Sequence, residues 1–204
     1  PQETMKVIHV AGTNGKGSTA AMLASILSKA GYRTGLYTSP FINRFNERMQ
    51  VDGQDIPDDT LARLTGVIKP LADQMADHPT EFELITSIGF AYFLEEKCDV
   101  VVLEVGMGGE LDSTNVIPVP ELAVITNIGL DHTRELGPTI TDIAKAKAGI
   151  IKEHGDVVIY GENAEADAVF IDVCRQRHAN LHVTDHGRIA NVRADLTRLT
   201  FDFT

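Results

Sequence analysis

The sequence predicts an α/β domain built on a mostly parallel sheet with helices on both faces. Short apolar runs rich in β-branched residues alternate with longer helical stretches, which is typical of parallel strands joined by crossover helices. The first run, residues 5–10 (MKVIHV), enters a glycine-rich loop that opens a helical stretch. Residues 189–203 instead alternate apolar and polar side chains, which predicts a short antiparallel ribbon at the C-terminal end.

Each predicted strand is a short apolar run, and each predicted helix is a longer run of helix-forming residues. The predicted strands are 6–10, 35–38, 99–105, 122–127, 157–160 and 181–184. The predicted helices are 18–30, 58–76, 82–96, 140–151 and 164–177. Right-handed crossovers place the carboxyl ends of parallel strands at one edge of the sheet, so functional residues are expected there.

Start and stop signals support the earlier elements. Gly31 follows the Ala- and Leu-rich run of the first helix, as expected at a helix C-terminus. Pro40 ends the second strand and biases the residue before it toward extended geometry. Asp58 and Asp59 open the second helix, where acidic side chains interact favourably with the helix dipole.

The composition indicates one globular domain. The chain of 204 residues is long enough to bury a core, and 43% hydrophobic with 23% charged residues argues against disorder. The net charge of −11 argues against a nucleic-acid-binding surface, and no apolar run is long enough for a membrane span. Cys98 and Cys174 lack metal-ligand spacing, which suits a reducing, cytoplasmic location. We therefore expect neither nucleic acid nor a membrane as a partner.

The loop between the first strand and the first helix has the composition of a phosphate-binding loop. Glycines let the backbone wrap a phosphate, the helix N-terminus attracts the anion, and Lys16 adds a point charge. A hydroxyl near this lysine can hold Mg²⁺. The residues predicted to bind the phosphates of ATP or GTP are Gly12, Thr13, Asn14, Gly15, Lys16, Gly17, Ser18 and Thr19.

This loop departs from the standard pattern of Gly, four residues, then Gly-Lys-Ser/Thr. Val10 stands where the first glycine of that pattern would be, and Gly17 separates Lys16 from Ser18. An ordinary glycine-rich turn is the alternative interpretation. Three glycines around a lysine, placed between an apolar strand and a helix, favour the phosphate site.

Two side chains that follow later strands are candidates for metal binding. Glu104 lies at the end of an apolar strand, and a carboxylate there needs a partner, which beside a phosphate loop is Mg²⁺. A salt-bridged or exposed glutamate is the alternative. His132 comes just after the strand at 122–127, where a neutral imidazole either reaches a metal or only bonds locally.

A group of lysines lies on a predicted helix among small neighbours. Lys145, Lys147 and Lys152 are surrounded by Ala and Gly, which implies close packing and predicts that one lysine points inward. Desolvation lowers the proton affinity of such a lysine, and its neutral amine can take up CO₂ as a carbamate. A solvated basic helix face is the alternative.

The segment after the second strand combines arginines with aromatic residues. Arg44 and Arg48, with Phe41 and Phe45, are predicted to form a lid or a site for an anionic, aromatic substrate. A structured surface loop is equally compatible with the sequence.

Taken together, these motifs resemble folylpolyglutamate synthase / dihydrofolate synthase, a family of the Mur ligase superfamily. The resemblance spans about residues 5–185, with the motifs in the family's order. The motifs are 10–18 (VAGTNGKGS), 38–40 (TSP) with 45–48 (FNER), 104–115 (EVGMGGELDSTN), and 131–133 (DHT) with 147–152 (KAGIIK). The resemblance implies a P-loop NTPase-like Mur ligase central domain over residues 1–204.

The resemblance also implies an ATP-dependent amide ligase. ATP would phosphorylate the terminal carboxylate of a folate or dihydropteroate, and L-glutamate would displace phosphate from the acyl phosphate. Two Mg²⁺ ions are implied, one at Ser18 and Glu104, the other at His132 and a carbamate on Lys147, and a monovalent cation is allowed. The implied catalytic residues are Lys16, Glu104, His132 and Lys147. The implied substrate-binding residues are Ser39, Pro40, Phe41, Arg44, Phe45, Arg48 and Glu83, in a cytoplasmic monomer.

The sequence departs from the family pattern at single positions and at its end. Phe41, Glu110 and Ala146 stand where the family usually has histidine, arginine and glutamate. The family's chain continues into a His-Gln-x-x-Asn-Ala helix and a smaller domain that completes the ATP and glutamate sites. The present chain is therefore expected to be truncated before the end of its domain, and to bind nucleotide weakly without ligating by itself.

Two other functions remain open. A Mur-type ligase that adds amino acids to a cell-wall precursor usually carries Gly-Lys-Thr/Ser-Thr in the loop, so Gly17 favours a folate enzyme. A non-catalytic nucleotide-binding module would also keep the loop. Such a module would not require Lys147, Glu104 and His132 to converge, so their positions in space distinguish it from an enzyme.

Overall fold

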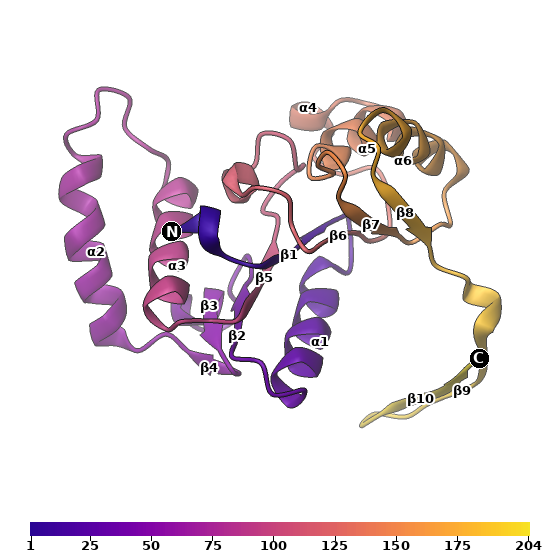
Figure 1. Cartoon of the computed structure of the whole chain (residues 1–204), viewed down its shortest axis with the longest axis horizontal. Helices are drawn as coiled ribbons and strands as arrows, with labels where there is room; N and C mark the ends of the chain where they lie inside the picture. The colour runs from indigo at the N-terminus through magenta and orange to yellow at the C-terminus, as the bar shows by residue number, and fades with distance from the viewer.

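The computed structural model describes residues 1–204 and contains an eight-stranded sheet in the order β4-β3-β2-β5-β1-β6-β7-β8 (Figure 1). The neighbouring strands β2, β5, β1, β6, β7 and β8 run parallel to one another. The strands β3 and β4 add an antiparallel hairpin at the β2 edge. The bounds are β1 (Val7–Ala11), β2 (Thr34–Tyr37), β3 (Met49–Val51), β4 (Gln54–Asp55), β5 (Val100–Glu104), β6 (Leu122–Ile125), β7 (Asp156–Ile159) and β8 (Asn180–Val183). The predicted fold class is confirmed.

Helices connect the strands and begin at the expected polar residues. The α-helices are α1 (Lys16–Lys29), α2 (Asp58–Ala72), α3 (Glu81–Glu95), α4 (Thr133–Leu136), α5 (Ile140–Ala148) and α6 (Ala164–Gln176). Short 3₁₀ turns are η1 (Gln2–Thr4), η2 (Phe45–Arg48), η3 (Ser113–Val116) and η4 (His186–Arg188). Thr80 and Thr139 cap α3 and α5, because each hydroxyl accepts from a backbone N–H in the first turn of its helix. No helix of the structure has both the length and the apolar character needed to cross a membrane.

Some predicted boundaries were wrong, and some elements were not predicted. α2 ends at Ala72 instead of residue 76, and α5 ends at Ala148 instead of residue 151. After α5 the chain turns so that Ile150 and Ile151 enter the core, where both side chains are completely buried. The β3–β4 hairpin and the single-turn helix α4 have no counterpart among the predictions.

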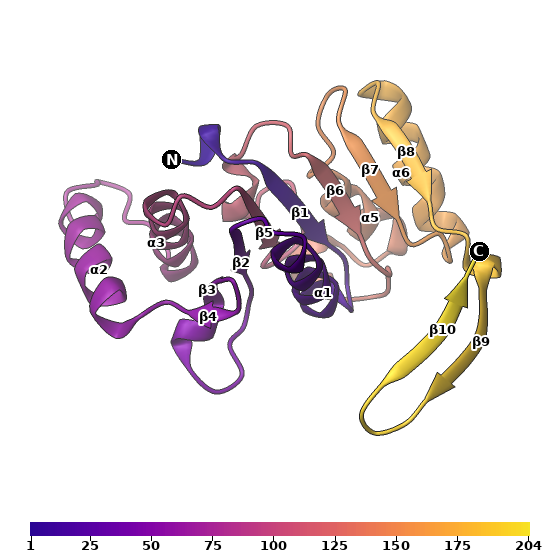
Figure 2. The same cartoon turned by 60° about the horizontal axis from the view of Figure 1, so that its bottom comes forward.

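Helices cover the two sheet faces unequally (Figure 2). Alternate residues of β1 point to opposite faces. Val7 packs with α2 and α3, Ala11 packs with α5 and α6, and Val10 on the other face packs with α1. Figure 2 shows α1 alone in front of the sheet, over its central strands. The helices α2, α3, α5 and α6 therefore share one face of the sheet. The helix α1, which follows the glycine-rich loop, covers the other face by itself.

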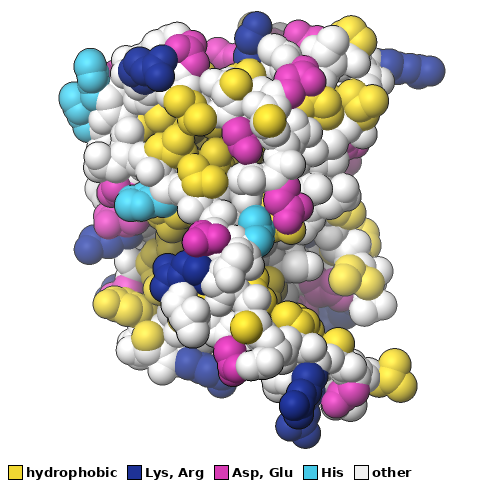
Figure 3. Space-filling model, turned by 90° about the vertical axis from the view of Figure 1, so that its right-hand side faces the viewer, with side chains coloured by type: hydrophobic (Ala, Val, Ile, Leu, Met, Phe, Trp, Pro, Cys, Tyr) yellow, Lys and Arg dark blue, Asp and Glu magenta, His cyan; other side chains and the backbone are white.

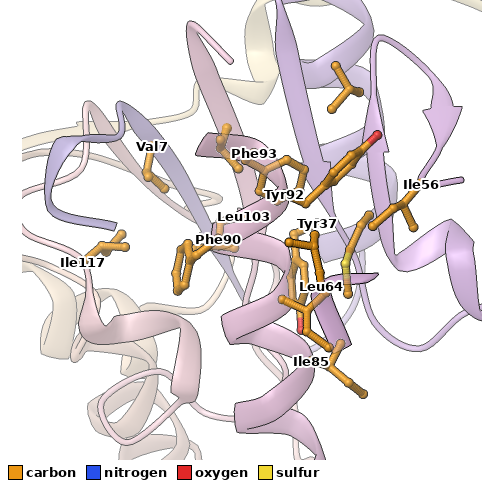
Figure 4. Close-up of a cluster of buried hydrophobic side chains, with 14 residues drawn as sticks. Val7, Tyr37, Ile56, Leu64, Ile85, Phe90, Tyr92, Phe93, Leu103 and Ile117 are labelled. Atoms are coloured by element: carbon orange, nitrogen blue, oxygen red, sulfur yellow. The ribbon is translucent and has the colours of Figure 1, made fainter. Parts of the chain in front are cut away.

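The largest core cluster lies between α3 and the strands β2, β3 and β5 (Figure 4). Its centre is aromatic, since Tyr37, Phe90, Tyr92 and Phe93 are all buried there. Gly35 on β2 lies against this cluster, because a Cβ at that position would be 2.8 Å from the ring of Phe93. The cluster holds β2 and β5 in place, and both strands end at the functional edge.

The C-terminal ribbon projects from the rest of the molecule. It consists of β9 (Ile189–Ala194) and β10 (Leu199–Phe203), which pair with each other and with no other strand. Every residue of both strands is exposed, including Phe201 and Phe203. Figure 3 views the end of the molecule that faces right in Figure 1, where exposed apolar side chains (yellow) lie among charged ones. The antiparallel ribbon predicted from the alternating pattern is confirmed.

Candidate functional site

The glycine-rich loop connects the end of β1 to the first turn of α1. Gly15 caps the helix in the left-handed conformation, with φ of 83°. The first helical hydrogen bond of α1 runs from Thr19 N to Gly15 O at 2.9 Å. The backbone N–H groups of Lys16, Gly17 and Ser18 precede that bond and have no partner within the helix. The loop therefore presents a row of amide donors suited to an anion.

Neighbouring segments hold this loop in place. The Thr126 hydroxyl, just after β6, donates to Asn14 O at 2.7 Å, and Thr13 N donates to Asn127 O at 2.8 Å. Gly12 has φ of 147°, and a Cβ there would lie 1.8 Å from Thr126 Oγ1. No residue except glycine fits this position, because a side chain would overlap the hydroxyl that anchors the loop.

Two lysines converge on the same loop carbonyl. Lys16 Nζ donates to Gly12 O and Thr13 O, both at 3.1 Å, and Lys147 Nζ donates to Gly12 O at 2.8 Å. Lys147 is 2% exposed, and burial together with the charge of Lys16 lowers its pKa to about 8. The prediction that one lysine of this helix points inward is confirmed for Lys147, whereas Lys145 is exposed.

Glu104 lies beside the loop at the end of β5. It is 4% exposed, and its Oε2 accepts from Ser39 N at 3.1 Å. A Cβ on Gly17 would lie 3.4 Å from that same oxygen, so the carboxylate faces the first turn of α1. Burial raises the pKa of Glu104, while the Ser39 amide and Lys16 act in the opposite direction. The second carboxylate oxygen, Oε1, accepts no hydrogen bond from the protein.

His132 lies at the same edge but is not buried. It is the N-cap residue of α4 in the left-handed conformation, and its Nε2 is 3.6 Å from Asp131 Oδ1. The charge of Asp131 opposes the lowering of the Lys147 pKa by burial and by Lys16, so this segment faces the buried lysine. No three His, Cys, Asp or Glu side chains come together as a metal-binding group.

A cavity of about 610 Å³ is lined by Ser39, whose N–H bonds to Glu104. One wall is the turn at residues 106–112, and Pro40 and Arg48 also line the cavity. The Ser39–Pro40 peptide bond is cis. The remaining lining residues are Phe82, Ser113, Glu135, Leu136 and Ala146. The size and mixed lining suit a small organic ligand.

Arg48 packs against two of the predicted aromatic residues, Phe41 and Phe45, whose ring centres lie 6.0 Å apart and neither of which lines the cavity. Its guanidinium carbon is 5.5 Å from the Phe41 ring centre and 5.7 Å from that of Phe45. No carboxylate pairs with Arg48, so its charge is available to the cavity. Arg44, by contrast, pairs with Asp58 at 3.1 Å and does not line the cavity.

Glu83 occupies a different place from the one predicted. Its carboxylate accepts from the Thr80 N–H and hydroxyl, both at 2.7 Å, and these bonds lower its pKa. It therefore completes the cap of α3 and lies outside the 610 Å³ cavity. The neighbouring Phe82 lines the cavity instead.

Two polar residues under the cavity wall were missed. His9 on β1 and Thr114 on η3 are both completely buried, and His9 Nε2 lies 2.8 Å from Thr114 Oγ1. A histidine within an apolar strand was a signal in the sequence. Its partner is separated from it by 105 positions, so the pair could not be recognised from local patterns.

The fold and this site define a phosphate-loop α/β domain: a central parallel strand leads into an amide-rich loop on which two lysines and a carboxylate converge. The chain belongs to the Mur ligase family, because the sequence model for the Mur ligase middle domain matches residues 10–198.

Known relatives agree with this assignment. Folylpolyglutamate synthase from Lacticaseibacillus casei is 49% identical over 174 residues, covering 83% of this chain and 40% of the relative. Dihydrofolate synthase/folylpolyglutamate synthase from Bacillus subtilis is 47% identical over 171 residues, covering 81% and 40%. The chain thus spans well under half of these relatives.

Solved structures show the same architecture. A structure described as an FPGS–AMPPCP–folate complex is 42% identical, with a TM-score of 0.90 over 100% of this chain and 51% of that one. Mycobacterium tuberculosis folylpolyglutamate synthase complexed with ADP is 33% identical, with a TM-score of 0.90 over 98% of this chain and 47% of that one.

Proposed function

We propose that this chain is the ATP-binding domain, residues 1–204, of a ligase that joins L-glutamate to folate or dihydropteroate through an acyl phosphate. The convergence of Lys16 and Lys147 on Gly12 O, beside the buried Glu104, is the observation that carries the proposal. A binding module has no need for a second, buried lysine at the loop. The folylpolyglutamate synthases among the relatives support folate as the acceptor.

In this proposal the loop residues 12–19 hold the triphosphate of ATP. The free amides at the start of α1 point to the phosphate oxygens, and Lys16 exchanges its carbonyl partners for the β- and γ-oxygens. Lys147 holds the Gly12 carbonyl, and therefore the entrance of the loop, in position. The reaction joins two anions, so the positive charge of Lys16 lowers the cost of their approach.

The acceptor occupies the cavity of about 610 Å³ beside Glu104. Arg48, which packs against Phe41 and Phe45, supplies a cation for a carboxylate, and Phe82 on the cavity wall supplies an aromatic surface for a ring system. The acceptor carboxylate attacks the γ-phosphorus, and ADP leaves. The glutamate amine then attacks the acyl carbon, loses a proton and displaces phosphate.

The donor set fits Mg²⁺. Glu104 keeps one carboxylate oxygen free of protein hydrogen bonds, and the Ser18 hydroxyl belongs to the helix turn that this carboxylate faces. His132 and a carbamate formed on Lys147 are the residues that would hold a second ion. When bound, the ions neutralise charge on the phosphates.

The deciding experiment measures ADP release by the natural polypeptide that carries this sequence. ADP release is expected to require ATP, L-glutamate and either tetrahydrofolate or dihydropteroate together. The E104Q variant is expected to lose at least about 100-fold in turnover, whereas E95Q, an exposed carboxylate on α3, keeps the wild-type rate. Turnover with a cell-wall nucleotide precursor in place of folate, or nucleotide binding without turnover, would overturn the proposal.

A further inference from the structure

A chain of hydrogen bonds, buried at His9 and partly buried at Asp112, joins β1 to the wall of the cavity. His9 Nε2 lies 2.8 Å from Thr114 Oγ1, and that hydroxyl lies 2.5 Å from Asp112 Oδ1. His9 and Thr114 are both 0% exposed. His9 comes from β1, and Asp112 and Thr114 come from the segment that begins η3. The hydrogen bonds therefore connect two parts of the molecule that are far apart in sequence.

The direction of these hydrogen bonds is fixed. The two Asp112 oxygens already accept the backbone N–H groups of Thr114 at 3.0 Å and Met107 at 2.8 Å. The Thr114 hydroxyl therefore donates to the carboxylate and must accept its other bond from His9 Nε2–H. The Nδ1 atom of His9 is buried without any partner, which agrees with a neutral ring protonated on Nε2.

Asp112 connects the His9–Thr114 pair to the turn that lines the cavity. Its bond to Met107 N closes the turn at residues 106–112, which forms one wall of the cavity. Asn115 Nδ2 donates to Glu110 O at 3.1 Å and to Gly149 O at 3.2 Å, which fastens the same turn to the end of α5. His9 is the only one of these anchors that lies on β1, three residues before Gly12 of the phosphate loop.

We propose that His9 and Thr114 are positioning residues that fix the acceptor wall, residues 106–112, relative to the phosphate loop. The proposal rests on the ligase function proposed above, because the acceptor is assigned to this cavity. Neither side chain lines the cavity, so both act through Asp112 and the backbone of the turn. The acceptor carboxylate must meet the γ-phosphate in line, so a displaced wall weakens acceptor binding while the nucleotide still binds.

The first test replaces the central hydroxyl in the natural polypeptide. T114V keeps the shape of the side chain but removes the hydroxyl, and T114S keeps the hydroxyl. T114V is expected to raise KM for folate about tenfold, while its KM for ATP stays within about twofold of wild type. T114S is expected to keep the wild-type KM values for both substrates. T34V is the matched control. Thr34 is also buried, but it lies at the start of β2, whereas the cavity residue Ser39 follows the end of that strand.

The second test uses the direction of the hydrogen bonds. Gln places its amide N–H near the position of imidazole Nε2, whereas Asn places it near Nδ1. H9Q is therefore expected to keep a folate KM closer to wild type than H9N does. An unchanged folate KM in T114V, or an equal rise of both KM values in a variant with wild-type urea midpoint, would overturn the positioning role.

A third measurement needs no substrate and separates this inference from the proposed function. Amide hydrogen exchange at residues 106–112 is expected to accelerate in T114V and to stay unchanged in T34V. If wild-type protein releases no ADP with folate, the ligase proposal fails, yet faster exchange would still support the anchoring of the turn. Unchanged exchange at residues 106–112 would refute the anchoring whatever the enzyme does.

Discussion

Lys147 combines full burial with a charge that no carboxylate neutralises. Its Nζ bonds only to the Gly12 carbonyl, and Lys16 lies close enough to add repulsion. Burial lowers the pKa of Lys147 to about 8, so a larger fraction of its amine is neutral than in an exposed lysine. The neutral amine is the form that reacts with CO₂, which is the chemical basis for the proposed carbamate.

This burial predicts a dependence of stability on pH. The pKa of Lys147 falls from 10.5 in the unfolded chain to about 8 in the folded protein. Between these values the unfolded state binds a proton that the folded state lacks, so unfolding becomes less favourable as pH rises. The unfolding free energy of wild type minus that of K147M is expected to increase by up to about 1.4 kcal/mol per pH unit from pH 8 to 10.

Urea unfolding of both proteins at pH 7.5, 8.5 and 9.5 measures this difference. Comparing with K147M is necessary because Cys98 and Tyr37, whose pKa values are raised from 9.0 and 10.0 to about 12, lower stability as the pH rises above those ordinary values. These groups are common to both proteins and cancel in the difference. A difference that stays constant with pH would show that Lys147 keeps an ordinary pKa.

At the scale of elements, α5 and the turn at residues 106–112 are in close contact. A Cβ on Gly149 would lie 2.3 Å from Glu110 Cα, and one on Gly109 would lie 2.9 Å from Ala146 O. The backbones therefore touch where two glycines face each other. This contact sets the position of Lys147, which lies on the same helix as Ala146.

A matched pair of glycine substitutions tests the contact. Gly149 has an ordinary helical φ of −59°, so G149A adds no backbone strain and acts only through overlap with Glu110. It is expected to lower the unfolding free energy by about 2–3 kcal/mol. G66A, in the exposed middle of α2 with nothing within 4 Å, is expected to raise it by up to about 1 kcal/mol. Urea midpoints measure both, and an equal response would contradict the close approach.

The sequence predicted those elements whose signals are local. The run from β1 through the loop to α1 carries its own pattern, and the small residues around three lysines predicted that one of them points inward, which is Lys147 in the structure. The β3–β4 hairpin escaped prediction because its strands have only three and two residues, too short for a periodic pattern. Its turn, Asp52-Gly53, was a recognisable signal, with φ of 50° and 77° at these residues.

The rest of the site depends on contacts between distant segments. Glu83 was implied as a substrate-binding residue by the family resemblance, yet Thr80 is close enough to bind its carboxylate locally. His9 and Thr114 meet only because the folded chain places η3 over the side of β1 to which His9 points. Such pairs follow from the topology and not from any stretch of the sequence.

At the scale of the whole molecule, stability is distributed unevenly between the sheet and the ribbon. β1 and β5 lie in the middle of the eight-stranded sheet, with paired neighbours on both sides and residues such as Val10 and Val102 fully buried. β9 and β10 pair only with each other and have no buried residue. An isolated two-stranded ribbon is only marginally stable in water.

This difference predicts two classes of amide hydrogen exchange. Amides of β1 and β5 open only with global unfolding, because both strands are bonded on two sides, whereas the ribbon opens by itself. Exchange at residues 189–203 is therefore expected to be faster than at Val7–Ala11 and Val100–Glu104 by at least about a thousandfold. Mass spectrometry of exchanged peptides, at several protein concentrations, measures this.

Protection of the ribbon at every concentration would contradict the prediction. Protection that increases with concentration would show that the exposed apolar face of Leu199, Phe201 and Phe203 pairs with another copy of the chain.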